Sequence, residues 1–307
     1  MGNTGLRRWH AAFAAGLAAL AMTLGLTTAP ASAYPPSDVD YVALGDSYTA
    51  GTGADAPARP FVFDPPCDQT PNGYVDHVDA VDPVHLVLNS ACHGALLREK
   101  AQPGNVPSVQ DQITQLISSG ALSRDTELVS MTAGANDVGV NVVLFQCATS
   151  TTSACSQAVS SAIAAMPAVG AGLVHAFKVI HRHAPYAKIV VLGYPRLLNP
   201  AFPAPMSPDN LRLVNQGTAL LNATIASAAA TARLLYGAKV QYVDVTGRFA
   251  GHEVNTPQPW IFFAATQDLA TGTVHFDPRS FHPNQAGHQA YADALISAVR
   301  PARPAHS

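Results

Sequence analysis

The chain has 307 residues, 48% of them hydrophobic, and its 17 Lys and Arg residues against 20 Asp and Glu residues give a formal net charge of −3. This mildly acidic balance, with no block or stripe of basic residues, argues against a nucleic-acid partner. No segment repeats at a fixed period, which excludes a solenoid or a propeller.

The first 33 residues have the features of a signal peptide. Two arginines, Arg7 and Arg8, precede an apolar stretch over residues 11–26, and Ala31-Ser32-Ala33 is a small-residue cleavage site. We therefore expect a secreted, extracellular protein whose mature chain, residues 34–307, is a single domain. The paired arginines fit both the general and the twin-arginine export routes. We expect no later run to span a bilayer, and so no stable membrane anchor.

Hydrophobic patterning predicts strands that alternate with helices along the mature chain. In chain order the predicted elements are strand 41–44, loop 54–82, strand 84–88, helix 108–117, strand 127–131, helix 138–145, cysteine-bounded loop 147–155, helix 157–182, strand 188–192, loop 195–208, helix 208–236, strand 240–245, irregular segment 247–279 and helix 284–299. This alternation predicts a three-layer α/β/α sandwich around a parallel sheet of about five strands. The irregular segment is too long for a mere connection, which suggests that it has a function.

Four cysteines in an exported chain predict two disulfides. Their spacing favours Cys67 with Cys92 and Cys147 with Cys155, although four cysteines allow three pairings. The sequence lacks the C-x-x-C and H-E-x-x-H spacings of common metal sites, and it has neither a G-x-G-x-x-G nor a Walker A motif. We therefore expect no metal and no other cofactor.

Three predicted strands end close to residues that suit acyl transfer. Ser47, Gly94 and Asn136 each follow a strand, and the carboxyl ends of parallel strands collect at one edge of a sheet. His282 lies just before the last predicted helix. Acyl transfer needs a nucleophile, a base and donors for an oxyanion, which Ser47, His282 and the Ser47 amide, Gly94 amide and Asn136 side chain can supply. The competing interpretation of Ser47 is a helix N-cap.

These residues resemble the SGNH hydrolases, also called GDSL lipases and esterases. The resemblance rests on Gly45-Asp46-Ser47-Tyr48, on Gly94, on Gly134-Ala135-Asn136-Asp137 and on His282, in that order, and it spans the mature chain. It implies a flavodoxin-like α/β sandwich that works through a Ser47 acyl-enzyme with His282 as general base. The cysteine pattern and residues 247–279 look most like the secreted bacterial lipases and esterases. Tyr48 replaces the usual leucine of the family, and we expect no catalytic effect of that change.

Arg279 occupies the position, three residues before His282, where the family usually has an aspartate. The third member of the site therefore stays open between two alternatives. One is the carboxylate of Asp277, and the other is a main-chain carbonyl near Arg279 or Ser280, an arrangement similar to that of relatives that lack the acid.

The apolar residues Trp260, Phe262 and Phe263 are predicted to line the acyl pocket or its rim. The expected function is a secreted carboxylic ester hydrolase that acts on esters with an apolar acyl group, contacts a lipid surface and works as a monomer. A carbohydrate deacetylase, a phospholipase or a thioesterase could use the same residues. A non-catalytic secreted binding module is the alternative from a different class, because a fold does not imply an activity.

Overall fold

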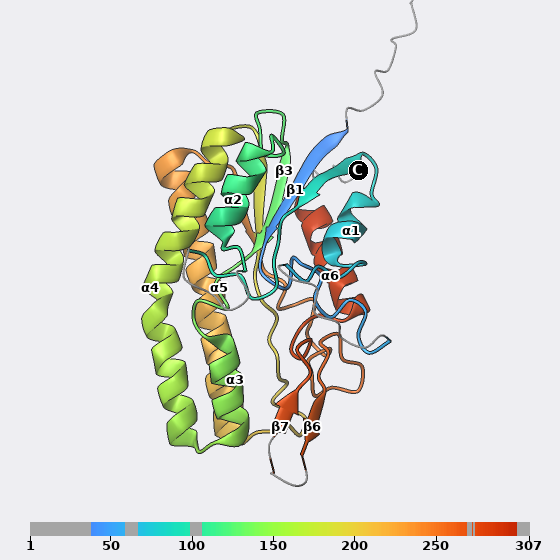
Figure 1. The fold of residues 1–307 in the computed structure, drawn as a ribbon. Coiled ribbons are helices and arrows are strands. Elements are labelled where there is room, and N and C mark those ends of the chain that lie inside the picture. The colour runs from blue at the N-terminus through green and yellow to red at the C-terminus, as the bar shows by residue number, and fades with distance from the viewer. Residues whose placement is uncertain (1–37, 59–66, 99–105, 269–271, 273, 300–307) are drawn as a thin grey trace, which may run out of the picture. The chain divides into compact units, whose positions relative to one another are not determined.

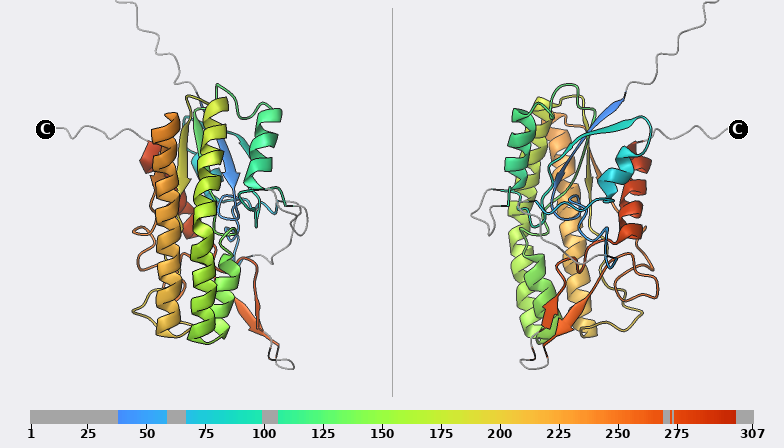
Figure 2. Two further views of the ribbon diagram at one scale, coloured as in Figure 1. Left: turned by 90° about the vertical axis from the view of Figure 1, so that its left-hand side faces the viewer. Right: turned by 45° about the vertical axis from the view of Figure 1, so that its right-hand side comes forward.

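A computed structural model describes residues 38–58, 67–98, 106–268, 272 and 274–299 (Figures 1 and 2). The expected signal peptide, residues 1–33, lies outside the described residues. The described residues group into one compact unit.

A parallel sheet of five strands forms the centre of this unit. Its strands are β1 (Val39–Gly45), β2 (Val84–Asn89), β3 (Leu128–Thr132), β4 (Lys188–Leu192) and β5 (Val240–Val243), in the spatial order β2-β1-β3-β4-β5. All of β3 and the last five residues of β1 are buried, as expected of strands covered on both faces. The predicted five-stranded parallel sheet is confirmed.

Helices cover both faces of the sheet and complete the predicted three layers (Figure 1). On one face lie α1 (Tyr74–Asp79) and α6 (Gln285–Val299), and on the other lie α2 (Val109–Ser118), α4 (Thr152–His183) and α5 (Pro208–Tyr236). The lower parts of α4 and α5 extend past the carboxyl edge of the sheet (Figure 2). There they pack against α3 (Val140–Thr149), and Phe145 of α3 contacts Phe276 in the hairpin of β6 (Ala265–Gln267) and β7 (Val274–Phe276).

Local sequence signals set the starts of the long helices. Ser108, Thr151 and Ser207 are N-caps whose side-chain oxygens accept a backbone N–H from the first turns of α2, α4 and α5. Asp111 completes a capping box with Ser108, and Pro208 opens α5, where its missing N–H costs nothing.

Three segments differ from the sequence-based expectation. Residues 54–82 were expected to be a loop but contain α1, a helix too short to show a clear period, which is anchored by its buried residues Tyr74 and Val78. The segment between Cys147 and Cys155 is not a loop, because α3 and α4 extend over both cysteines and leave only residues 150–151 between them. The segment 247–279 contains the β6–β7 hairpin, whose three-residue strands are too short to give an alternating pattern.

The helix α4 is, among the described residues, long and apolar enough by length and composition to cross a membrane. This differs from the expectation that no run after the leader would be. Its buried residues recur at helical spacing, from Cys155 and Val159 to Phe177 and Ile180, and they belong to the hydrophobic core. In this fold, α4 serves as a core helix with one buried face.

Both predicted disulfides are present. Cys67 pairs with Cys92, which ties the loop before α1 to the end of β2, and Cys147 pairs with Cys155, which ties α3 to the first turn of α4.

Candidate active site

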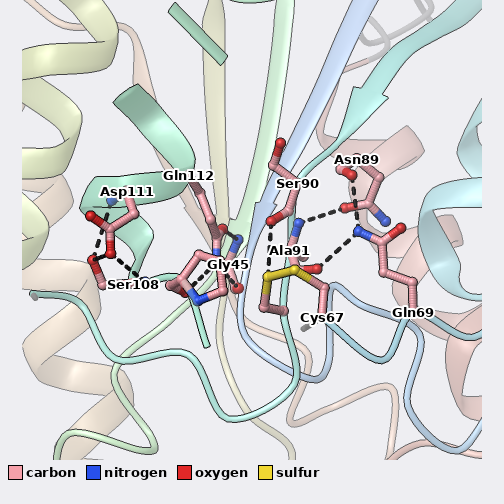
Figure 3. Close-up of a disulfide and its surroundings, with 11 residues drawn as sticks. Gly45, Cys67, Gln69, Asn89, Ser90, Ala91, Ser108, Asp111 and Gln112 are labelled. Carbon is pink, nitrogen blue, oxygen red and sulfur yellow. Dashed lines mark hydrogen bonds between the residues drawn. A yellow bond between two sulfur atoms is a disulfide. The ribbon is translucent and has the colours of Figure 1, made fainter. Parts of the chain in front are cut away.

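The side chain of Gln112 holds the backbone where β1 ends (Figure 3). Its Oε1 accepts a hydrogen bond from the Gly45 N–H at 2.7 Å, and its Nε2 donates to the Gly45 carbonyl at 3.0 Å. A Cβ at Gly45, where φ is +134°, would lie 2.2 Å from the carbonyl oxygen of Thr132. Only glycine therefore fits here, and it brings the chain to Ser47 at a fixed point on the carboxyl edge of the sheet.

Asp46 holds the turn that carries Ser47. Its buried carboxylate accepts hydrogen bonds from the Tyr48 N–H at 3.1 Å, from the Thr132 hydroxyl at 2.6 Å and from the Tyr194 hydroxyl. Burial raises the pKa of Asp46, an effect that these hydrogen bonds only partly offset. Asp46 therefore has a structural role in this turn.

Ser47 and His282, 235 positions apart in the chain, meet at this edge. Ser47 Oγ lies 2.7 Å from His282 Nε2, within hydrogen-bond distance. Both residues line one cavity, and Gly94 and Asn136 line it too. The structure thus brings together all four residues that the sequence patterns singled out.

The loop that carries His282 is held by backbone and side-chain hydrogen bonds. The Phe262 N–H donates to the His282 carbonyl at 2.8 Å, and the Phe281 N–H donates to the Phe262 carbonyl at 2.7 Å. The Tyr48 hydroxyl donates to the Phe281 carbonyl at 2.6 Å. A Cβ at Gly53 would lie 2.4 Å from the carbonyl oxygen of Pro283, so a glycine there lets the chain after Ser47 approach this loop.

Trp260, Phe262 and Phe263 are not among the described residues that line the cavity at Ser47. The Trp260 ring stacks on His252 with centroids 3.7 Å apart, and the Phe263 ring packs against Phe281 at 5.1 Å. The Phe262 ring lies 5.3 Å from the guanidinium of Arg279. The three aromatic rings thus take part in packing contacts around the His282 loop, and their role in acyl binding stays a prediction.

The ring of His282 faces a main-chain carbonyl on its other side. His282 Nδ1 lies 3.1 Å from the carbonyl oxygen of Ser280. Asp277 binds Arg279 instead, accepting hydrogen bonds from its backbone N–H at 2.8 Å, its Nε at 3.0 Å and its Nη2 at 2.7 Å. The Arg279 carbonyl accepts the backbone N–H of His282 at 3.2 Å. Of the alternatives left open, a main-chain carbonyl faces the imidazole, and of the two carbonyls considered it is that of Ser280.

Burial of the imidazole lowers the pKa of His282 to about 3, and the nearby His93 ring acts in the same direction. The hydrogen bonds to backbone carbonyls at Arg279 and Ser280 act against this shift. A neutral imidazole with its proton on Nδ1, bonded to Ser280, leaves Nε2 free to accept the hydroxyl proton of Ser47.

The disulfide between Cys67 and Cys92, drawn in Figure 3, holds the segment that carries Gly94, and Gly94 lines the same cavity as Ser47. The His93 N–H donates to the Cys67 carbonyl at 2.8 Å, and the Cys92 N–H donates to the Gly45 carbonyl at 3.1 Å. These bonds fix the turn after β2 against the end of β1. Within the described residues, the backbone N–H groups of Ser47 and Gly94 donate to no other group, so both can bind an oxyanion.

Asn136 presents its side-chain amide to the same cavity. Its Nδ2 donates one hydrogen to the Ala95 carbonyl at 3.0 Å, which orients the amide and leaves the second hydrogen available. The neighbouring Asp137 accepts the Leu97 N–H at 3.1 Å. These two bonds join the turn after β3 to the segment after Gly94.

Two residues of the site were missed from the sequence. His93 lines the cavity, its ring lies 5.4 Å from that of His282, and burial lowers its pKa. Its position next to Gly94 was the signal that could have identified it. Tyr48, to which we assigned no effect, binds the carbonyl of Phe281 in the His282 loop, a contact that sequence spacing cannot reveal.

The described part of the chain contains no group of three or more His, Cys, Asp and Glu side chains that could hold a metal ion.

The fully buried His288 has a structural position. Its Nδ1 accepts the Tyr74 N–H at 3.2 Å and its Nε2 donates to the Thr52 carbonyl at 3.1 Å.

Comparison with known proteins identifies relatives over most of the chain. Residues 43–290 match the model of the GDSL-like lipase/acylhydrolase family. The chain is 31% identical to a lipase of Streptomyces rimosus, over 91% of this chain and 94% of that one. Its structure is similar to that of an extracellular lipase from Streptomyces rimosus, with 26% identity, a TM-score of 0.65 and coverage of 85% of this chain and 100% of that one. It is also similar to a phospholipase A1 from Streptomyces albidoflavus, with 27% identity, a TM-score of 0.63 and coverage of 84% and 98%.

Proposed function

Because the chain belongs to the GDSL-like lipase/acylhydrolase family and is therefore a serine ester hydrolase, we propose that it is secreted and hydrolyses carboxylic esters through an acyl-enzyme at Ser47. The observation that carries this proposal is the 2.7 Å contact between Ser47 Oγ and His282 Nε2 in a cavity shared with Gly94 and Asn136.

In the first half of the reaction, His282 Nε2 takes the proton of Ser47 Oγ as the oxygen bonds to the ester carbonyl carbon. The carbonyl oxygen becomes an oxyanion, and the N–H groups of Ser47, Gly94 and Asn136 stabilise its charge. The bond from carbon to the alcohol oxygen then breaks, and His282 gives its proton to the departing alcohol. The products of this half are the free alcohol and an ester on Ser47.

In the second half, a water molecule attacks the acyl carbon while His282 takes its proton. The bond to Ser47 Oγ breaks, the proton returns to Ser47, and the carboxylic acid leaves. In both halves the imidazolium is stabilised by the Ser280 carbonyl rather than by a carboxylate, which makes the site a Ser–His dyad.

Export is supported by two independent features. Residues 1–33 have the pattern of a signal peptide, and the two disulfides suit an oxidising compartment. The similar lipase from Streptomyces rimosus is an extracellular protein by name.

Phospholipid hydrolysis is the second candidate, and it is favoured by the similarity to a phospholipase A1. A phospholipid and a simple ester present the same acyl carbonyl to Ser47, so the mechanism above serves both. They differ in the alcohol that leaves, which is larger and charged in a phospholipid.

The purified mature protein should be assayed on p-nitrophenyl butyrate, p-nitrophenyl decanoate, phosphatidylcholine vesicles and an acetylated sugar. We expect turnover of both p-nitrophenyl esters. Release of fatty acid from the vesicles would favour the phospholipase, and activity on the acetylated sugar alone would replace the lipase assignment by a deacetylase. A folded protein that cleaves none of the four would contradict the proposed function.

A further inference from the structure

An apolar pocket lies between α3, α4 and α5 and shares lining residues with the cavity at Ser47. We propose that this pocket, which we name the helix pocket, receives the acyl chain of the substrate and sets the chain length that the enzyme prefers. The proposal rests on the proposed function and specifies the substrate of the same site.

Two long helices form the floor of the helix pocket. Val159, Ala162 and Met166 face it from α4, and Val214 and Leu221 face it from α5. Within each helix these residues are three, four or seven positions apart, so they form one stripe along one side. These five residues are between 3% and 7% exposed, and such a small exposed fraction is expected for the walls of a narrow groove.

The remaining side of the helix pocket is α3, which packs against α4 and α5 beyond the carboxyl edge of the sheet (Figure 1). Val140 and Leu144 of α3 line both the helix pocket and the cavity at Ser47, and so does Leu221 of α5. The proposed path of an acyl chain bonded to Ser47 therefore leads past these three apolar side chains into the helix pocket. The disulfide between Cys147 and Cys155 fixes the far end of α3 to α4.

A second cleft, on the side of the β6–β7 hairpin, shares lining residues such as His93 and Ser280 with the cavity at Ser47, and its chemistry is different. His93, Asn141, His275 and Asp277 line it together with aromatic residues. Polar and titratable groups can form hydrogen bonds with an alcohol or a headgroup. An acyl chain would displace the water around them and form no hydrogen bond in its place. The polarity of the two spaces thus assigns the acyl chain to the helix pocket and the leaving alcohol to the hairpin cleft.

Gly217 of α5 provides a direct test, because it lines the helix pocket without a side chain of its own. The nearest atom to a Cβ built there is Cγ1 of Val159, at 3.9 Å, so a Cβ fits in ordinary contact and a larger side chain must occupy the pocket. Gly217→Phe should therefore exclude the distal methylenes of a long acyl chain and leave room for a short one.

The measured quantity is the ratio of kcat/KM for p-nitrophenyl decanoate to that for p-nitrophenyl butyrate. Each methylene withdrawn from apolar contact costs about fourfold, so loss of two or more should lower the ratio at least about tenfold in Gly217→Phe. Ala162→Leu, which fills the pocket from the opposite wall, should lower the ratio in the same direction. If either filling variant fails to fold, as judged by its melting curve, the other alone decides the outcome.

Two controls separate filling of the pocket from other effects. Gly217→Ala removes the glycine but adds no more than a Cβ, and it should keep the ratio within about twofold of the wild type. Ala219→Phe adds the same ring to an exposed position of α5, and it too should keep the ratio. Equal loss on both esters in the filling variants, or no loss on either, would overturn the proposal and direct the acyl chain to the hairpin cleft.

Binding of decanoate to Ser47→Ala, measured by calorimetry, tests the pocket without any turnover. Gly217→Phe added to Ser47→Ala should weaken this binding at least about tenfold, by the same loss of methylene contacts. If the wild type cleaves no ester but decanoate binds and Gly217→Phe abolishes binding, the proposed function fails and the pocket stands. If esters are cleaved and Gly217→Phe leaves the affinity for decanoate unchanged, the proposed role of the helix pocket is wrong and the proposed function stands.

Discussion

A main-chain oxygen, not a carboxylate, orients the imidazole of His282. The Ser280 carbonyl at 3.1 Å selects the tautomer, but as a neutral group it stabilises the imidazolium less than a carboxylate would. Asp277 is held by three hydrogen bonds from Arg279, and these lower the pKa of Asp277. We infer that the Asp277–Arg279 pair holds the turn that presents the Ser280 carbonyl.

Asp277→Asn tests this division of roles. In a true triad the amide stabilises the wrong tautomer and costs about 10⁴ in kcat, whereas here an asparagine Oδ1 can still accept the Arg279 N–H. We expect kcat to fall less than about tenfold, because the carbonyl of Ser280 stays in place. A loss of three or more decades in a variant with an unchanged melting temperature would instead identify Asp277 as a catalytic residue.

Asn136→Ala tests the oxyanion donors. Its amide is oriented by the Ala95 carbonyl, and in the proposed mechanism it donates a hydrogen bond to charge that develops only in the transition state. We expect kcat to fall by roughly 10²–10³ with little change in KM. A change confined to KM would mean that Asn136 binds the ground state of the substrate.

At the scale of elements, the two disulfides support different parts of the site. Cys67–Cys92 fixes the turn that presents Gly94, and Cys147–Cys155 fixes α3 to α4. In the chain-entropy account, each should stabilise the fold by about 2–4 kcal/mol.

The double variant Cys67→Ser/Cys92→Ser should therefore lose both stability and kcat, because the Gly94 N–H is no longer fixed beside Ser47. The matched variant Cys147→Ser/Cys155→Ser should lose comparable stability while kcat on p-nitrophenyl butyrate is retained. Urea unfolding and steady-state kinetics at a temperature where both variants are folded measure the two effects. Equal kcat in the two double variants would refute the assigned role of Cys67–Cys92.

The strands and the long helices could be predicted because each leaves a regular sequence pattern. A strand buried on both faces is a continuous apolar run, and a helix buried on one face has apolar residues at helical spacing. Short elements such as α1 and the β6–β7 hairpin leave none, and they are set by tertiary contacts. Ser47, Gly94, Asn136 and His282 could be placed together because they follow sheet strands or match motifs. Trp260, Phe262 and Phe263 could not be placed, since an apolar run looks the same whether it lines a pocket or packs behind a loop.

At the scale of the whole molecule, burial keeps histidines neutral. Burial lowers the pKa of His288 to about 4, with a smaller contribution in the same direction from His77, and it lowers the pKa of His282 to about 3. In the unfolded chain these groups titrate near 6.5, so between that pH and the folded values the unfolded state binds more protons. Stability is therefore full above about pH 6.5 and falls as the pH drops toward 4.

His288→Gln removes one of these titrations, together with the small contribution of His288 to the lowered pKa of His282. The variant should be less stable than the wild type at pH 7.5, because it loses the fit of His288 to Tyr74 and Thr52. Between pH 6 and pH 4.5, its free energy of unfolding should fall less steeply, by up to about 1.4 kcal/mol per pH unit. Urea unfolding at several pH values measures this slope, and an identical slope in both proteins would show that His288 is not the group responsible.

The most direct test of the central claim is the ester hydrolysis rate of Ser47→Ala. In the proposed mechanism the hydroxyl of Ser47 forms the acyl-enzyme, and its only side-chain hydrogen bond among the described residues is to His282. Ser90→Ala is the matched control, because Ser90 is equally buried, at 6% exposed, and also follows a strand. We predict that Ser47→Ala keeps its melting temperature and loses at least about 10⁴-fold in kcat on p-nitrophenyl butyrate, while Ser90→Ala stays active. Turnover by a folded Ser47→Ala at a rate near that of the wild type would contradict the account.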